Sequence, residues 1–238
     1  MDSLAGRTVA ITGVGGGLGP AVAERFAAEG ANLAVCDIKA ELALDAIEGL
    51  GLPDERIAAS AVDLLDADAA RGWAEEIAER FGRADVLLHL VGGWRGGDPL
   101  ATAPLADYEW LHDLLVRTTQ HTTRAFHDQL AASPHGRFAI VSSSQAQKPA
   151  GTNAAYSAAK AAAEAWTLAL SDSFKQAESA ATSNVLVVNA IVTPAMREAS
   201  PEKPFKTFTS TGEIADGLAY ICSDAAAKMN GQRLSLHR

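Results

Sequence analysis

Tyr156 and Lys160 form the residue pair whose types and spacing most directly suggest chemistry. Residues four apart lie on one face of a helix, so a phenol and an ammonium group would meet there. A free tyrosine ionises near pH ~10, and a nearby positive charge favours the phenolate, so the pair predicts a proton donor and acceptor near neutrality. For the pair taken alone, an exposed tyrosine and a solvated lysine on an alanine-rich helix are the alternative.

Ser143 adds to this interpretation. It lies thirteen residues before Tyr156, after the apolar run 138–141. A strand over that run would deliver the serine hydroxyl to the edge of a sheet. We therefore expect the three side chains to form one catalytic group.

A glycine-rich turn near the N-terminus is a second, independent pattern. Residues 7–12 read as a buried strand, and the turn 13–19 leads directly into a helical pattern that starts at Pro20. Glycines let the main chain approach a pyrophosphate closely, and the N–H groups at a helix start favour an anion. The turn predicts a dinucleotide site; a tight turn without a ligand is the alternative.

Asp37 ends the next apolar run, 33–36. A carboxylate at this place can accept both hydroxyls of an adenosine ribose, and its charge repels a 2′-phosphate. Together with the glycine turn, it predicts NAD(H) as the cofactor.

In their order along the chain, these motifs resemble those of the short-chain dehydrogenase/reductase family, and the resemblance covers nearly the whole chain. The family motif Thr-Gly-x-x-x-Gly-x-Gly matches from Thr12 to Gly19, and its Ser, Tyr and Lys match at Ser143, Tyr156 and Lys160. The cofactor-binding residues that this implies are Gly13, Gly16, Gly17, Leu18, Gly19, Asp37, Ile38, Asp63, Leu64, Val91, Gly92, Tyr156, Lys160 and Thr193.

The resemblance also implies a role for each catalytic residue. Tyr156 would exchange a proton with the substrate oxygen while hydride passes to or from the nicotinamide, and Ser143 would orient that oxygen. Lys160 would lower the pKa of the tyrosine and hydrogen-bond the nicotinamide ribose. Asp63 would contact the adenine ring, with helix capping as the alternative, and Thr193 would bind the carboxamide.

Three departures from the family pattern point to an unusual site. After the fourth strand, the family's Asn-Asn-Ala-Gly becomes residues 89–92, in which the glycine is kept and both amides are lost; His89 is predicted to be a core histidine. The family's catalytic asparagine aligns with Leu115 or Arg117, which threatens rate more than reaction type. The Pro-Gly after the sixth strand becomes Thr193-Pro194.

The loop 92–97 follows the fourth strand, beside the expected nicotinamide site. We expect Trp94 to line the substrate pocket with Ser143 and Tyr156, and Arg95 is a candidate for holding an anionic substrate. For both loop residues, contact with a neighbouring subunit or with solvent is the alternative.

Residues 193–211 lack clear periodicity and carry three prolines together with Met196. Apolar residues in an irregular segment near the carboxyl ends of strands indicate a mobile substrate flap. A loop packed statically on the core is the alternative.

Composition limits the function classes. With 238 residues, 48% of them hydrophobic, we expect one domain spanning residues 1–238. The net charge of −9 disfavours nucleic acid as a partner. No membrane-spanning run or signal peptide is visible, so a cytoplasmic protein is expected. Cys36 and Cys222 lack metal-ligand spacing and are predicted to be buried hydrophobes, with no metal site.

Alternating patterns predict an α/β fold, a Rossmann-type doubly wound parallel seven-stranded sheet in a three-layer sandwich. Helical patterns fill every gap between the expected strands except the last. The strands are expected at Thr8 to Thr12, Leu33 to Asp37, Ile57 to Val62, Val86 to Val91, Phe138 to Ser142, Val185 to Val192 and Arg233 to Leu236.

The leading hypothesis is an NAD(H)-dependent oxidoreductase that interconverts a secondary alcohol and a ketone. The alternative is a non-catalytic dinucleotide-binding protein, a sensor or scaffold, which would need neither Ser143 nor Tyr156. A homotetramer, or a homodimer, is expected because the helix over 158–170 is apolar on most faces, with Trp166 and Leu170 one turn apart. The resemblance implies pairing through this helix and the one before strand five.

Overall fold

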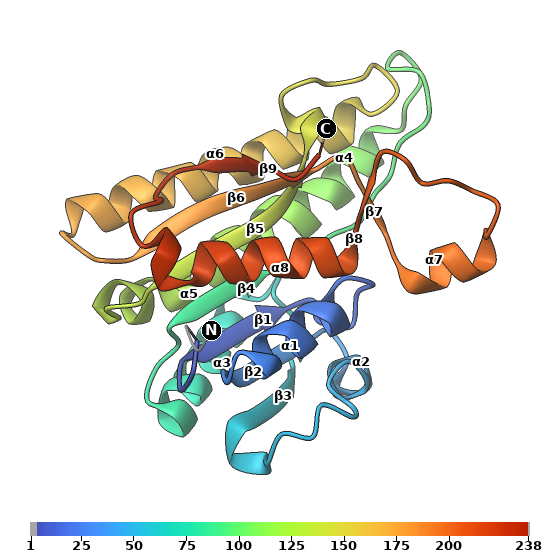
Figure 1. The fold of residues 1–238 in the computed structure, drawn as a ribbon. Coiled ribbons are helices and arrows are strands. Elements are labelled where there is room, and N and C mark those ends of the chain that lie inside the picture. Colours follow the sequence, from blue (N-terminus) through green and yellow to red (C-terminus); the bar gives the residue numbers. More distant parts are fainter. Residues whose placement is uncertain (1–3, 238) are drawn as a thin grey trace.

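The computed structural model describes residues 4–237, and its centre is one seven-stranded sheet (Figure 1). The strand order is β3-β2-β1-β4-β5-β6-β9, and every neighbouring pair is parallel. The predicted doubly wound α/β fold is confirmed. The strands are β1 (Thr8–Thr12), β2 (Asn32–Asp37), β3 (Ile57–Ala61), β4 (Val86–His89), β5 (Arg137–Ser143), β6 (Thr182–Val188) and β9 (Arg233–Ser235).

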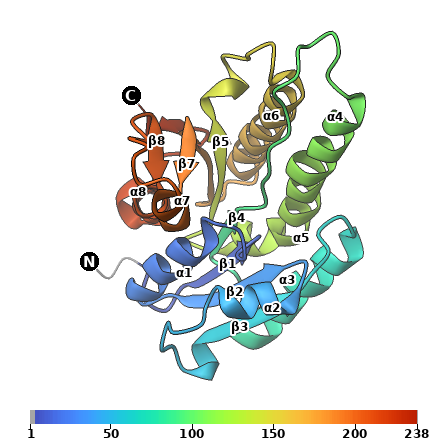
Figure 2. The same ribbon diagram turned by 90° about the vertical axis from the view of Figure 1, so that its right-hand side faces the viewer.

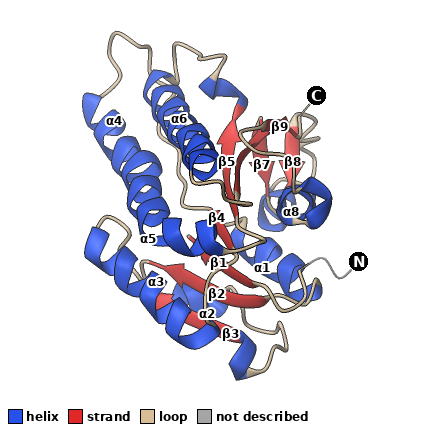
Figure 3. Cartoon of the chain, turned by 90° about the vertical axis from the view of Figure 1, so that its left-hand side faces the viewer, coloured by secondary structure: helices blue, strands red, loops and turns tan. Residues whose placement is uncertain are grey.

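Helices cover both faces of this sheet (Figures 2 and 3). Successive strand residues point to opposite faces, so in β1 the side chains of Val9 and Ile11 enter one core and that of Ala10 enters the other. The first core is closed by α1 (Gly19–Ala28), α2 (Ala40–Asp45) and α8 (Thr211–Cys222); the second by α3 (Ala67–Phe81), α5 (Thr118–Ala132) and α6 (Ala154–Gln176).

The predicted bounds of the sixth strand are wrong. The run 185–192 divides at Asn189 into β6 and a separate strand, β7 (Ala190–Val192), which pairs with β8 (Phe208–Ser210) in a two-stranded sheet. The amide of Asn189 donates a hydrogen bond of 3.2 Å to the main-chain oxygen of Thr207, which ties the break to the incoming strand. Long-range pairing, rather than local apolarity, therefore decides where β6 ends.

The expectation that the last gap has no helix is also wrong. Helix α8 fills it and buries Ile214, Leu218 and Ile221 against the first core. Ser210 and Glu213 form a capping box at its start, in which each side chain bonds the main chain of the other. The segment 193–211 itself contains β8 and a short helix, α7 (Pro194–Ala199).

A long, nearly continuous helical segment follows the fourth strand. It begins with α4 (Leu105–His112), passes through one π-helical turn over Asp113–Arg117, and continues as α5. Such turns shift the side chains that follow them around the helix axis. Within residues 4–237, no helix has both the length and the apolarity that crossing a membrane requires.

Candidate active site

Two adjoining hollows lie along the carboxyl edge of the central strands, with volumes of about 380 and 360 Å³. Both are walled by the glycine turn after β1 and by the segment after β4, and together they form one cleft. In a doubly wound sheet, ligands bind at this edge, where the strand order reverses. The residues common to both hollows are Gly13, Gly16, Leu90, Val91 and Gly92.

The glycine turn leaves no room for side chains. Gly13 has a φ of +65°, and a Cβ there would lie 2.8 Å from the main-chain nitrogen of Val91. A Cβ at Gly17 would lie 2.9 Å from Cγ2 of Thr193, so the turn also touches the segment after β7. This close approach leaves an exposed main-chain surface of the kind that a pyrophosphate needs.

Gly19 differs from the other predicted cofactor residues because it is buried and lines neither hollow. A Cβ there would lie 1.8 Å from the main-chain oxygen of Val14. Its function in this structure is to let α1 pack against the turn. Every other predicted cofactor residue lines one hollow or both.

Asp37 lies at the far end of the first hollow. One carboxylate oxygen accepts a hydrogen bond of 3.0 Å from the main-chain N–H of Gly15, and the other accepts one of 2.8 Å from Ile38. These bonds fix the orientation of the carboxylate in the wall of the hollow. No lysine or arginine is among the described residues that line this hollow.

Asp63 also lines the first hollow, two residues after the end of β3. Its carboxylate accepts a hydrogen bond of 2.9 Å from the N–H of Leu65, which closes a turn. The N-cap of α3 is Asp66, whose side chain accepts from Asp68 and Ala69. Asp63 therefore stabilises the turn before the cap and still presents its side chain to the cleft.

Ser143, Tyr156 and Lys160 line the second hollow together. Ser143 is the last residue of β5, and the other two lie in the first turns of α6. Burial raises the pKa of Tyr156 above its usual value, and the nearby Ser143 hydroxyl partly offsets this. The fold thus brings a phenol and a hydroxyl to the same hollow at the carboxyl edge of the sheet.

The predicted effect of Lys160 on the tyrosine is wrong in this geometry. Its ammonium donates a hydrogen bond of 2.8 Å to the main-chain oxygen of Val141 and lies 6.0 Å from the ring centre of Tyr156. Burial lowers the pKa of Lys160 to about 8, against the opposing effect of Glu164. The lysine is attached to the sheet, and burial decides the pKa of the phenol.

His89 is the buried core histidine that the sequence predicts. Its Nδ1 lies 2.8 Å from the hydroxyl of Thr12, and its Nε2 lies 3.1 Å from that of Thr118. The Thr118 hydroxyl already donates to the main-chain oxygen of Leu114, so it accepts from Nε2–H, and Nδ1 accepts from Thr12. Burial, and next the charge of Lys160, lower the pKa of His89 to about 3, so the ring is neutral.

Neither residue aligned with the family's asparagine enters the cleft. Leu115 is buried with Ala159 in a small apolar cluster, and Arg117 pairs with Asp113 at 3.2 Å near the surface. Leu114 and Thr118, at the π-helical turn, line the first hollow instead. The sequence carries no signal for these two, because the π-helical turn changes which side chains of the segment face inward.

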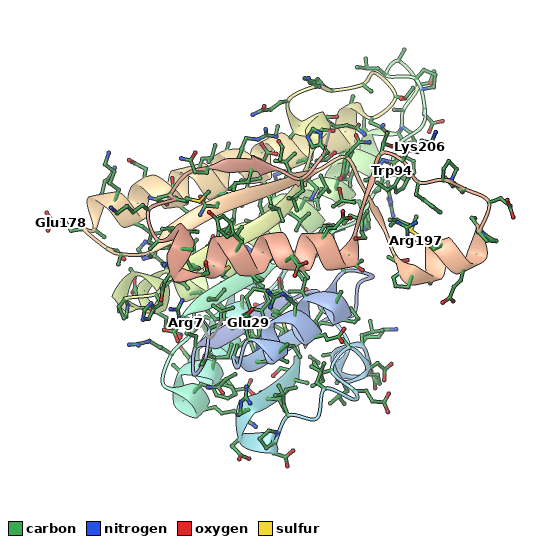
Figure 4. The ribbon with its side chains drawn as sticks, viewed as in Figure 1. Arg7, Glu29, Trp94, Glu178, Arg197 and Lys206 are labelled. Atoms are coloured by element: carbon green, nitrogen blue, oxygen red, sulfur yellow. The ribbon has the colours of Figure 1, made fainter. Side chains whose placement is uncertain are left out.

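The loop after β4 separates two neighbouring residues. Trp94 lines the second hollow, as does Met196, and is 58% exposed. Arg95 instead turns onto α4, where it pairs with Asp107 at 3.3 Å and lies 4.1 Å above the ring of Trp110. Its proposed role in holding an anionic substrate is not supported by this placement. Trp94 lies on the side of the molecule that carries β7, β8 and α7 (Figure 4).

Other lining residues were missed from sequence. Ser142 also lines the second hollow, and its buried hydroxyl has no hydrogen-bond partner among the described residues. Only its position beside Ser143 hinted at this. Apolar wall residues that carry no chemical signal complete the cleft, among them Leu42, Leu90, Val141, Val188 and Ile191.

Comparison with known proteins places this arrangement in a family. The sequence pattern of the family described as short chain dehydrogenase matches residues 7–204. The chain belongs to this family. Short chain dehydrogenases are oxidoreductases that bind a nicotinamide dinucleotide.

Individual relatives agree with this placement along nearly the whole chain. A 7alpha-hydroxysteroid dehydrogenase of Escherichia coli (strain K12) is 26% identical over 242 residues, covering 98% of this chain and 93% of that protein. A second relative is the subunit BbsD of a (2S)-[(R)-hydroxy(phenyl)methyl]succinyl-CoA dehydrogenase of Thauera aromatica. It is 29% identical over 237 residues, which cover 96% of this chain and 94% of that protein.

Solved structures of short chain dehydrogenases share the fold. The structure described as SDR:Glucose/ribitol dehydrogenase from Brucella melitensis superposes with a TM-score of 0.84 at 29% identity, covering 98% of this chain and 96% of that one. An NAD+-bound xylitol dehydrogenase has a TM-score of 0.85 at 21% identity, with 98% of each chain covered, which shows the fold alone.

Proposed function

We propose that this short chain dehydrogenase is an NAD(H)-dependent enzyme that interconverts a secondary alcohol and a ketone. The observation that carries the proposal is that Ser143, Tyr156 and Lys160 line one hollow. That hollow continues past the glycine turn to the carboxylate of Asp37. A dinucleotide lying along the cleft would reach both ends.

In this proposal, the protein moves one proton and holds one oxygen atom. A bound nicotinamide supplies or accepts the hydride. Tyr156 is protonated near neutral pH, because burial raises its pKa, so its phenol donates a proton to a ketone oxygen and takes it back in the reverse direction. Ser143 holds the same oxygen by a hydrogen bond. Lys160 lies on the cleft wall, where an ammonium suits a ribose hydroxyl.

The proposed preference for NAD(H) rests on charge. Asp37 presents a fixed carboxylate at the place of the adenosine ribose, and the described lining of that hollow offers no lysine or arginine to a 2′-phosphate. Two like charges in a partly enclosed site repel each other more strongly than in water. NADP(H) would therefore bind more weakly.

The substrate would enter beside Trp94 and Met196, which flank the second hollow. Besides Tyr156 and Lys160, its described lining contains no titratable side chain, so an uncharged substrate suits it better than an anionic one. We extend the proposal to residues 193–211 as a flap over this entrance, within one domain of residues 1–238. Met196 is carried by α7 inside that segment.

The test is NADH oxidation with a panel of ketones that differ in charge at similar size, such as cyclic ketones against keto acids. Steady turnover with an uncharged ketone supports the proposal. NADH binding seen by fluorescence, with no turnover of any ketone and no oxidation of the matching alcohols by NAD+, would favour the non-catalytic sensor or scaffold instead.

A further inference from the structure

A buried ion pair lies one helical turn beyond the proposed catalytic lysine. Glu164, on α6, is 5% exposed, and its two carboxylate oxygens accept hydrogen bonds of 2.6 and 3.1 Å from Nε and Nη2 of Arg233. This is the bidentate geometry in which a guanidinium binds a carboxylate most tightly. The arginine side chain is 19% exposed, so most of the pair is shielded from solvent.

The position of Arg233 gives the pair a mechanical role. It belongs to β9, an edge strand of three residues that pairs only with β6. A strand this short forms few main-chain hydrogen bonds with its neighbour, so these bonds add little to its stability. The ion pair therefore fastens α6, which carries Tyr156 and Lys160, to the last strand of the sheet.

The position of Glu164 also gives it an electrical role. It follows Lys160 by four residues, so the two side chains lie on one face of α6. The charged and titratable groups near the lysine are His89 from β4, Tyr156 and Glu164 from α6 and, through Glu164, Arg233 from β9. With the histidine neutral and the phenol protonated, Glu164 is the negative charge among them.

We propose that Glu164, oriented by Arg233, is a positioning residue that keeps Lys160 protonated and holds its helix in register with the sheet. The proposal rests on the proposed function only for its effect on turnover. The charge state of the lysine itself can be measured on the resting protein, without substrate or cofactor.

The direct test is an NMR titration of Lys160 after reductive ¹³C-methylation, assigned with Lys160→Arg. In the native protein, its resonance is expected to titrate near pH 8. In Glu164→Gln, which keeps volume and hydrogen-bonding groups but removes the charge, the midpoint is expected at lower pH. Glu29→Gln is the matched control, because Glu29, the residue that follows the last turn of α1, is also a largely buried carboxylate paired with an arginine, Arg25.

The functional test is the pH dependence of kcat/KM. If the lysine midpoint falls by about one pH unit, kcat/KM falls about tenfold at pH 9 and only about twofold at pH 7, because fewer molecules carry the ammonium. Arg233→Lys keeps the positive charge but loses the bidentate guanidinium contact with Glu164. It is expected to lower kcat and to change the pH profile less than Glu164→Gln does.

Removing one partner of a buried ion pair leaves the charge of the other uncompensated, and this can prevent folding. If Glu164→Gln does not fold, the double variant Glu164→Gln/Arg233→Gln replaces it, because this variant leaves neither charge of the pair. A folded double variant with the lysine midpoint moved to lower pH supports the proposal. A folded single or double variant with the native midpoint and pH profile overturns it. A shifted midpoint in a protein that turns over no ketone would refute the proposed function and leave this inference standing.

Discussion

The ammonium of Lys160 donates its hydrogen bond to the main-chain oxygen of Val141, at 2.8 Å, and not to the phenol one turn earlier. The lysine is thereby attached to β5, the strand that ends in Ser143. Burial, not the lysine, then decides the pKa of Tyr156 and raises it. At neutral pH, the resting site holds a phenol ready to donate a proton, as the reduction of a ketone requires.

Tyr156→Phe is expected to lower kcat by about 100-fold to 10,000-fold, because it removes the oxygen that transfers the proton. The dissociation constant for NADH should stay near the native value, since the ring remains in place. Tyr220→Phe is the matched control, because this tyrosine is 50% exposed on α8 and lines neither hollow. Native turnover by the Tyr156 variant in a verified assay would refute the assignment.

Asp37 is expected to make NADPH bind at least about tenfold more weakly than NADH, which corresponds to about 1.4 kcal/mol of repulsion. Asp37→Asn keeps an oxygen for the N–H of Gly15 and removes the charge, so the two constants should approach each other in calorimetry. In the control variant Asp63→Asn, the dissociation constants for NADH and NADPH should change by a similar factor. Equal constants for the two cofactors in the native protein would contradict the prediction.

His89 is expected to make the protein less stable in acid. Its folded-state pKa of about 3 lies below the ordinary 6.5, so between these values the unfolded chain binds more protons. Its contribution to stability is complete above pH 6.5 and is lost as the pH falls. The expected loss is about 2 kcal/mol between pH 6.5 and pH 5.

Urea unfolding of native protein and His89→Asn at both pH values tests this. The variant should lose less stability than the native protein on acidification, whereas His112→Asn, at a half-exposed position on α4, should follow the native dependence. An unchanged acid dependence in His89→Asn would show that the histidine does not titrate as its burial requires.

We expect the chain to assemble as a homotetramer, or a homodimer, through α5 and α6. Between these helices lies a hollow of about 380 Å³ at Trp166, whose ring N–H donates to Thr123 at 2.9 Å. Leu170, expected on the same outer surface, is only 8% exposed and packs into the second core, so Trp166 is the better probe. A small open hollow beside an aromatic ring suits an inserted side chain of a second copy.

Light scattering at micromolar concentration should therefore give a multiple of the chain mass, and Trp166→Glu should reduce it, because a charge would be buried at the interface. Tyr220→Glu, on the opposite layer, should leave the mass unchanged. If the native protein has the mass of a single chain, the predicted assembly is refuted. If Trp166→Glu has the same mass as the native protein, the face formed by α5 and α6 is excluded as the interface.

The sequence by itself determined the fold class, the order of the first five strands and most of the polar groups that line the cleft. The strand over 8–12 and the glycines after it are read from local patterns, because burial on both faces demands apolar runs and close approach demands glycine. Tyr156 and Lys160 share a helical face for equally local reasons. These predictions needed no knowledge of which strands are neighbours.

Only the tertiary structure decided what surrounds those groups. The bond from Lys160 to Val141, the break at Asn189 and the turn of Arg95 onto Trp110 each depend on residues distant in sequence. The pairing of Glu164 with Arg233 spans 69 positions and appears only when β9 closes the sheet. Burial and charge act through space, so pKa values and partners follow from packing, which no local pattern encodes.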